Sequence, residues 1–299
     1  MPEVQIPYLR RVMVRIGPIE EWRGGGNEKL ALTFHGDGGI DNFRIQFDIH
    51  KHAMSTATPS VIMITNLSQG LRNALRQGGI QVAVYVGWSN TDMVLLHTGS
   101  LLAAISRRNG PDIVTELYSN PAYGGIHRQP ITLNFSGGQS IKELVAFMAA
   151  RIPGVDVDPK NILISPEKAT GTQGLSFQGE LNDGLNKLAR EYSFSWNIEN
   201  KVFRAFDHER YFTGSDIPLI SSTTGLVRVD PMLASPQQLV RGVSIQSMLN
   251  PYVQPGHLIR LQSDLNPDLS GQYAVHMLSH SGDTHGMTWD SNIVSFVTR

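Results

Sequence analysis

Short runs in which apolar and polar residues alternate recur along this chain, and they constrain its fold more than any other feature. In the first 120 residues they are RVMVRI (11–16), KLALTF (29–34), FRIQFDIH (43–50), IQVAVYVGW (80–88) and IVTELYS (113–119). An alternation with period two predicts strands that bury one face. The 29 Gly and 16 Pro are typical of a chain with many turns. Closely spaced strands with short turns indicate a β barrel or sandwich.

A short helix is predicted within this first β segment. Ser68 is its N-cap, Leu71 and Leu75 lie on one face, and Gly78-Gly79 end it. Residues 93–107 predict a long or bent strand, and RNGPD (108–112) has the composition of a turn.

The composition changes near residue 120, where SNPAYGGIHRQP (119–130) reads as a linker. Residues 140–154 then predict a helix with a Ser140/Glu143 capping box. Its apolar stripe is Ile141, Leu144, Val145, Met148 and Ile152. A second helix over 180–192 has its own stripe, formed by Leu181, Leu185, Leu188 and Tyr192. The strands 193–198 and 201–206 follow, joined through Glu199-Asn200, and complete a small α+β domain.

From about residue 218 the chain returns to strands. The segments 78–117 and 255–293 share one order: Gly, short strand, polar turn, Gly, longer strand, polar turn with Gly and Asp, final strand. We interpret this as a repeated β unit on both sides of the α+β segment. The expected fold class is mainly β with an α+β insert. The expected domains are two β-barrel or sandwich domains, 1–125 and 218–299, and the small α+β domain 126–217 between them.

Composition excludes several classes of protein. Cysteine is absent, which rules out a disulfide scaffold, thiolate–zinc sites and cysteine nucleophiles. The net charge of −1 provides no basic field for nucleic acid or an anionic membrane. Arg10, Arg11 and Arg15 interrupt any signal peptide, and the longest apolar run, LVAFMAA (144–150), is far shorter than the roughly 20 residues of a membrane span. We therefore expect synthesis in a cytosol and no stable membrane association.

The stretch SHSGDTHGMTW (279–289) is the strongest candidate for chemistry. His280, Asp283 and His285 lie within six positions and His276 is just upstream, a density that allows a metal site or acid–base chemistry. Ser, Gly and Asp are also the residues that a hairpin turn requires. The matching turn of the repeat, SRRNGPD (106–112), has no histidine. We therefore predict an exposed hairpin tip, with His280 and His285 as candidates for contact with a neighbouring chain.

The remaining candidates are weaker. Asp48, His50 and His52 share one face of a strand, where a polar outer surface is favoured over a metal site. His35 and Asp37 read as turn residues, and Glu20-Glu21 as a carboxylate pair in a loop. The sequence has no nucleophile elbow, zinc-protease motif or phosphate-binding loop, and GDGGID lacks the third glycine of a dinucleotide fingerprint. We expect no catalytic residues, no cofactor and no metal.

Three stretches resemble the hub proteins of bacteriophage tail baseplates. ITNLSQGLRNALRQGGIQVAVYVGW (64–88) resembles their strand–helix–strand pattern, and residues 247–289 resemble their last domain through LNP, PGHLI, GQYAV and HSGDT. Residues 175–206 resemble the small domain that separates their two barrels. The likeness covers nearly the whole chain in the right order, whereas the first 25 residues, including WRGGG, match least.

The resemblance implies a structural protein of the virion, assembled in the host cytoplasm and similar to the hubs of contractile tails. Such hubs are homotrimers whose two tail-tube-like domains per chain form a pseudo-sixfold ring. The ring joins the tail tube to the central spike and contacts other baseplate components. DNA passes through its lumen only as cargo, and with a net charge of −1 we expect a mixed or acidic lumen. The alternatives are a tail-associated hydrolase of cell wall or glycan that uses the histidine cluster, and a non-catalytic carbohydrate-binding β module.

Overall fold

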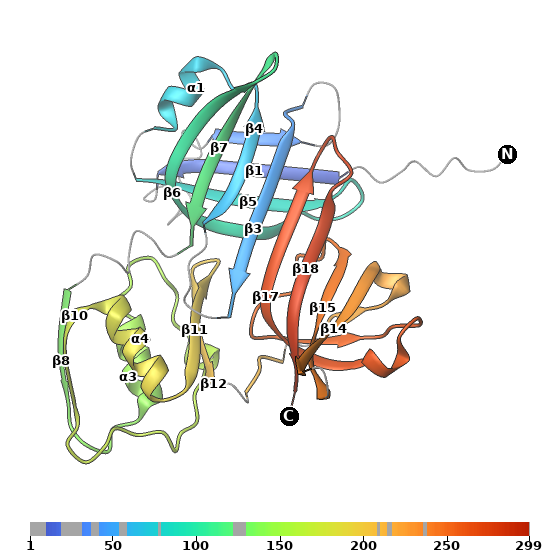
Figure 1. Ribbon diagram of the computed structural model, residues 1–299. Coiled ribbons are helices and arrows are strands. Elements are labelled where there is room, and N and C mark those ends of the chain that lie inside the picture. Colours follow the sequence, from blue (N-terminus) through green and yellow to red (C-terminus); the bar gives the residue numbers. More distant parts are fainter. Residues whose placement is uncertain are drawn as a thin grey trace. The chain divides into compact units, whose positions relative to one another are not determined.

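The chain forms two compact units, each built from separate stretches of the sequence (Figure 1). Unit 1 comprises residues 1–49, 59–120 and 280–289, and unit 2 comprises residues 50–58, 121–279 and 290–299. The computed structural model describes residues 10–18, 32–36, 42–53, 59–76, 79–121, 130–207, 210–213, 217–235 and 238–298. The division into domains 1–125, 126–217 and 218–299 stays a prediction.

Unit 1 is an antiparallel β structure with one short helix. Its elements are β1 (Arg10–Pro18), β2 (Leu32–Gly36), the first part of β3 (Ile45–His52), β4 (Ser60–Thr65), α1 (Gln69–Ala74), β5 (Ile80–Trp88), β6 (Val94–Asn109), β7 (Asp112–Asn120), and the ends of β17 (Gly271–Asp283) and β18 (Trp289–Val297) that fall in this unit. The strand order is β17-β3-β4-β7-β6-β5-β1-β2.

The alternating pattern of the sequence is the burial pattern of these strands. In β3, Ile45, Phe47 and Ile49 are almost completely buried, and the residues between them are partly exposed. In β4, Ile62 and Ile64 are fully buried on one face. Burial of such side chains stabilises by about 1.5–3 kcal/mol each, so the alternation alone commits one face of each strand to the core.

Helix α1 begins where the sequence predicts. The Ser68 side chain caps it by accepting a hydrogen bond from the backbone N–H of Leu71, at 3.4 Å. Leu75 is buried just after the last turn. Gly79 lies beyond it with a φ of +79°, a conformation that glycine adopts without strain.

The first part of unit 2 is α+β. It contains β8 (Pro130–Phe135), α3 (Ile141–Ala149), the 3-10 turn η3 (Pro159–Asn161), β9 (Ile162–Leu163), β10 (Leu175–Glu180), α4 (Leu181–Glu191), β11 (Phe194–Glu199) and β12 (Val202–Asp207). Figure 1 shows α3 and α4 between the β8–β10 pair and the β11–β12 hairpin. Both predicted helix stripes face the core that these elements share, with Tyr192 at its margin.

Two predicted details of this part are wrong. The Ser140 side chain makes no capping hydrogen bond. Residues 138–141 instead pair with 168–170 through backbone hydrogen bonds, among them one from the Ile141 N–H to the Lys168 carbonyl, at 2.9 Å. The hairpin turn is Asn200-Lys201, because Glu199 pairs with Val202. Both turn residues have positive φ, 51° and 67°, as a two-residue type I′ turn requires.

The second part of unit 2 is β. It contains β13 (Leu219–Ile220), η4 (Ser222–Thr224), β14 (Leu226–Ser235), β15 (Gln238–Met248), β16 (Leu258–Leu261), η5 (Pro267–Leu269) and the parts of β17 and β18 that fall in this unit. The order is β14-β15-β18-β17, with β16 also beside β17 and β13 beside β16. A cluster of buried aliphatic side chains, including Val243, Ile259 and Ile293, forms its core.

Both copies of the predicted repeat form three-stranded meanders. In the first, β5 pairs with β6 and β6 pairs with β7. In the second, β16 pairs with β17 and β17 lies next to β18. The fold class, mainly β with an α+β insert, is confirmed.

Several predictions fall on residues outside the described ranges. These are residues 1–9, WRGGG (22–26), Glu20-Glu21, Asp37, the first half of KLALTF and most of the linker 119–130. Within the described ranges, no helix is long and apolar enough to cross a membrane.

Candidate functional site

The stretch around Asp283 is only partly a hairpin tip. Strand β17 continues to Asp283 and β18 starts at Trp289, so the connection is only 284–288. The prediction of an exposed tip is wrong for its first half, since His280 is 0% and Asp283 5% exposed. His285 and Met287 are exposed. His280 is therefore not a candidate for contact with a neighbouring chain, whereas His285 stays one.

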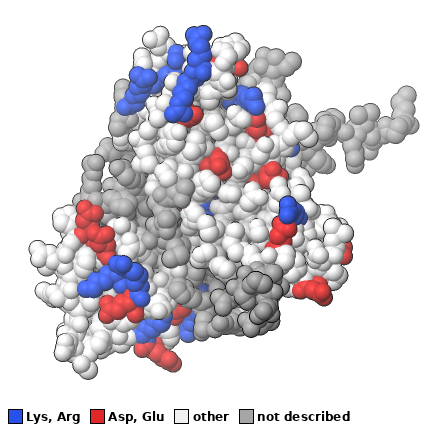
Figure 2. Space-filling view, in the orientation of Figure 1, with Lys and Arg blue, Asp and Glu red and all other residues white. Residues whose placement is uncertain are grey.

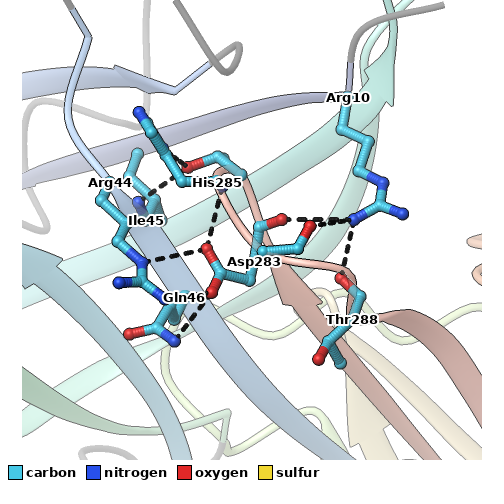
Figure 3. A network of polar contacts seen from close by, with 9 residues as sticks. Arg10, Arg44, Ile45, Gln46, Asp283, His285 and Thr288 are labelled. Atoms are coloured by element: carbon cyan, nitrogen blue, oxygen red, sulfur yellow. Dashed lines mark hydrogen bonds and ion pairs between the residues drawn. The ribbon is translucent and has the colours of Figure 1, made fainter. Parts of the chain in front are cut away.

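The Asp283 carboxylate is the centre of a polar network within unit 1 (Figure 3). Arg44 donates to both oxygens, from Nε to Oδ1 at 3.2 Å and from Nη2 to Oδ2 at 2.6 Å. Gln46 Nε2 donates to Oδ2 at 3.0 Å, and the backbone N–H of His285 donates to Oδ1 at 2.9 Å. Every donor comes from residues 44–46, at the start of β3, or from the turn itself.

The network changes the acidity of its members. Burial alone would raise the pKa of Asp283, but the hydrogen bond from Arg44, the backbone N–H groups of His285 and Gly286 and the Arg44 charge together lower it. The hydrogen bond to Asp283 correspondingly raises the pKa of Arg44. The carboxylate is thus ionised and fully engaged at neutral pH.

Arg10 holds the other side of the turn. Its guanidinium donates to the carbonyl oxygens of Gly286 at 2.7 Å, Met287 at 3.1 Å and Thr288 at 3.3 Å. The same group lies 5.5 Å from the ring centroid of Trp289, a cation–π distance. One side chain from β1 therefore binds three consecutive carbonyls of the turn, of which that of Thr288 also accepts from the Asp283 N–H at 3.0 Å.

The turn is also packed tightly against β3. Thr284 Oγ1 accepts a hydrogen bond from the Ile45 N–H at 3.0 Å, and the Thr284 N–H donates to the Ile45 carbonyl at 3.1 Å. Gly282 contacts the Phe47 ring so closely that a Cβ there would overlap it. Phe47 in turn packs edge-on against Trp289, with ring centroids 5.8 Å apart.

This arrangement orients a turn, and its polar atoms are engaged with one another. Both Asp283 oxygens accept hydrogen bonds from cationic or amide donors, and His285 Nδ1 lies 2.9 Å from Thr284 Oγ1. Among the described residues, no group of three or more His, Asp or Glu is placed to hold a metal ion. The geometry is that of a structural clamp.

The other predicted candidates are dispersed. His276 is half-buried in unit 2, with its ring centroid 5.1 Å from that of Phe296. Asp48, His50 and His52 do occupy one partly exposed face of β3. His35 is exposed in β2, and its carbonyl accepts a hydrogen bond from the Phe43 N–H at 3.2 Å.

Sequence reasoning missed a second polar cluster, which lies in unit 2. Lys51 and Glu199 are almost completely buried, with Nζ and Oε2 3.6 Å apart. Burial lowers the pKa of Lys51 and raises that of Glu199. Burial also lowers the pKa of His257 to about 4, with a further contribution from the Arg204 charge. The sequence does carry one signal for Lys51: it follows Ile45, Phe47 and Ile49 in the inward phase of β3, where the alternation predicts a buried side chain.

Comparison with known families identifies the chain. The family model for the baseplate hub gp41 matches residues 30–288. The chain belongs to the baseplate hub gp41 family. No curated protein sequence matches this baseplate hub chain.

Solved structures with similar folds include tail proteins and a secretion-system component. The tail protein from Neisseria meningitidis MC58 matches the hub chain with a TM-score of 0.63 and 11% identity over 97% of both chains. The 43 kDa tail protein of prophage MuSo2 from Shewanella oneidensis gives 0.58 and 10% identity, over 96% of this chain and 97% of that one. The E. coli c3393 protein is a type VI secretion component with structural similarity to T4 tail proteins gp27 and gp5. It matches with a TM-score of 0.57 and 13% identity, over 87% of this chain and 75% of that one. At these identities the likeness shows a shared fold.

Proposed function

We propose that three copies of this chain form the pseudo-sixfold ring of a phage tail baseplate that joins the tail tube to the central spike. The repeated three-stranded meander, β5–β6–β7 and β16–β17–β18, carries the proposal. A chain with two similar β units presents six such units in a trimer, so it can face a sixfold partner on one side and a threefold partner on the other. The proposed domains are 1–125, 126–217 and 218–299.

The family and the fold support this role. The family is that of a baseplate hub, and one similar structure is described by its likeness to the T4 tail proteins gp27 and gp5. The proposed partners are a second and third copy, the tail tube protein, the spike protein and other baseplate components. The protein belongs to the virion, is assembled in the host cytoplasm, and lets DNA pass as cargo. It associates with no membrane and acts without catalysis or cofactor.

The clamp around Asp283 fits a structural role better than a hydrolase site. A glycoside hydrolase needs two carboxyl groups that face the scissile bond. Here the residue Asp283 is 5% exposed, and its carboxylate accepts hydrogen bonds from Arg44, Gln46 and His285.

Electron microscopy of purified tails tests the proposal, with the mass of the isolated protein in solution as a second measurement. We expect three copies around a threefold axis, with both meanders of each copy in one ring. Any other copy number, or a position outside the junction of tube and spike, contradicts it. A carbohydrate-binding module instead predicts a monomer that glycans stabilise against unfolding, and a hydrolase predicts glycan cleavage lost in His280→Ala and His285→Ala variants.

A further inference from the structure

The hairpin of β6 and β7 extends beyond the strands on either side of it. Strand β5 pairs with β6 only as far as Ser100, and β4 pairs with β7 only as far as Val114. From Leu101 to Asn109, β6 pairs with β7 alone among the described strands. Residues 107–112 at the tip are all exposed. The hairpin therefore presents both a tip and a strand edge to its surroundings.

Helix α1 is anchored beside this hairpin. The Asn66 side chain, two residues before the helix cap, donates to Asp112 Oδ1 at 2.8 Å and accepts from the Ile113 N–H at 2.9 Å. The Asn66 N–H also donates to the Ile113 carbonyl, at 2.7 Å. These bonds hold the start of α1 against the base of the hairpin tip.

Four arginines lie in or next to these two elements, and we call them the arginine surface: Arg72 in α1, Arg76 just after it, and Arg107 and Arg108 in β6. Figure 2 shows basic side chains gathered over α1 and the end of the β6–β7 hairpin. Arg107 forms an ion pair with Glu116 at 2.5 Å, and Asp112 is engaged by Asn66. Among the described residues no carboxylate pairs with Arg76 or Arg108. Four arginines against two carboxylates leave an excess of two positive charges.

The corresponding hairpin of the repeat has the opposite character. In the β17–β18 turn, Arg44 binds the Asp283 carboxylate and Arg10 binds the Gly286 carbonyl, so both basic side chains are engaged by the turn itself. The two copies of the repeated meander thus differ in the hairpin that joins their last two strands. A trimer would carry three exposed arginine surfaces and three clamped turns.

We propose that the arginine surface is the contact site for an acidic surface of another baseplate protein. A protein partner fits better than nucleic acid, because the surface is chemically mixed: Arg107 shares one face of the hairpin with Glu116, Tyr118 and Ile105, a 40% exposed apolar side chain. Such mixed surfaces, enriched in arginine, are typical of protein interfaces, whereas nucleic acid favours a continuous basic stripe. The proposal rests on the proposed function for the existence of a baseplate partner.

The test uses a phage in which this chain carries Arg76→Glu and Arg108→Glu. Both residues are exposed, and Arg107 is left in place because it pairs with Glu116. Repulsion between the two new glutamates and the acidic partner surface should lower the yield of infectious particles by at least roughly tenfold. Suppressors that remove an Asp or Glu in another virion protein, or replace it with Lys or Arg, would support the proposal. The matched control is Lys187→Glu with Arg190→Glu, which makes the same charge change on the exposed side of α4.

Several outcomes would overturn it. They are an unchanged yield of infectious particles, suppressors confined to this chain, or a variant that no longer associates with itself. Binding of the unaltered protein to a fluorescent DNA duplex at physiological salt, lost in the variant, would assign the surface to nucleic acid instead. If the glutamate variant does not fold, Arg76→Gln with Arg108→Gln takes its place in the same selection. The mass of the unaltered protein tests the trimer separately, so failure of the trimer is distinguishable from failure of this contact.

Discussion

Arg44 and Asp283 form a two-point ion pair across 239 residues of sequence, with Nη2–Oδ2 at 2.6 Å and Nε–Oδ1 at 3.2 Å. The pair fastens the last hairpin turn of the chain to one of its early strands, and both residues belong to unit 1. A nearly buried carboxylate that accepts hydrogen bonds from Arg44, Gln46 and the backbone of the turn stabilises the fold more than an exposed surface ion pair does.

Asp283→Asn should therefore destabilise the protein by about 2 kcal/mol, because the amide cannot accept from Arg44 and Gln46 with both of its ends. Urea unfolding at neutral pH measures the loss. Asp92→Asn is the matched control, since Asp92 is exposed in the same unit and should change stability little. Equal stability of the two variants would show that the clamp contributes nothing.

The contribution of Asp283 should also depend on pH. Its pKa in the folded state is lower than the ordinary value of 3.8, so the folded state favours the ionised form. The stabilisation is complete above the ordinary value and is lost as pH falls through the lower, folded value. The difference in unfolding free energy between the unaltered protein and Asp283→Asn should accordingly shrink in acid. A constant difference down to the acid-unfolding limit would contradict the assigned shift.

Gly282→Ala should cost about 1–3 kcal/mol, because the new methyl group overlaps the Phe47 ring. Thermal unfolding checks this. Gly282→Ala should cost less stability in a Phe47→Leu protein than in the unaltered protein, because the ring that the methyl group overlaps is then absent. Gly70→Ala is the control, since nothing lies within 4 Å of a Cβ at that position in α1. It should leave stability unchanged or raise it by up to about 1 kcal/mol.

Lys51→Met should destabilise the protein by about 3–5 kcal/mol, because it leaves the Glu199 carboxylate buried without its ion-pair partner. The double variant Lys51→Met/Glu199→Leu should recover much of this loss, since it buries no charge. A double-mutant cycle by urea unfolding measures the coupling. Simple additivity of the two single changes would mean that the charges do not interact.

His257 should make stability fall as the solution becomes acidic. Its pKa is about 4 in the folded protein and 6.5 as an ordinary histidine, so the unfolded chain binds a proton first. Stability is therefore complete above pH 6.5 and declines as the pH falls to about 4, by on the order of 3 kcal/mol. His257→Gln should remove this part of the pH dependence. Unfolding free energies across that window, compared between the two proteins, decide the matter.

Local pattern was sufficient for most of the secondary structure. The alternation in β3 and β4 and the stripe of α3, from Ile141 to Met148, were readable because strand and helix periods repeat within a few residues. The hairpin turn at Asn200-Lys201 was misplaced by one residue, since its position depends on the register of both strands.

The sequence by itself determined most of the elements and the faces they bury, the repeated β unit and the likeness to a baseplate hub. Only the tertiary structure decided that Asp283 is buried and bound to Arg44, and that Lys51 lies opposite Glu199. The physical reason is the range of the interactions. Periodicity is set by near neighbours along the chain, whereas the partner of a buried charge is set by which distant strands pack together.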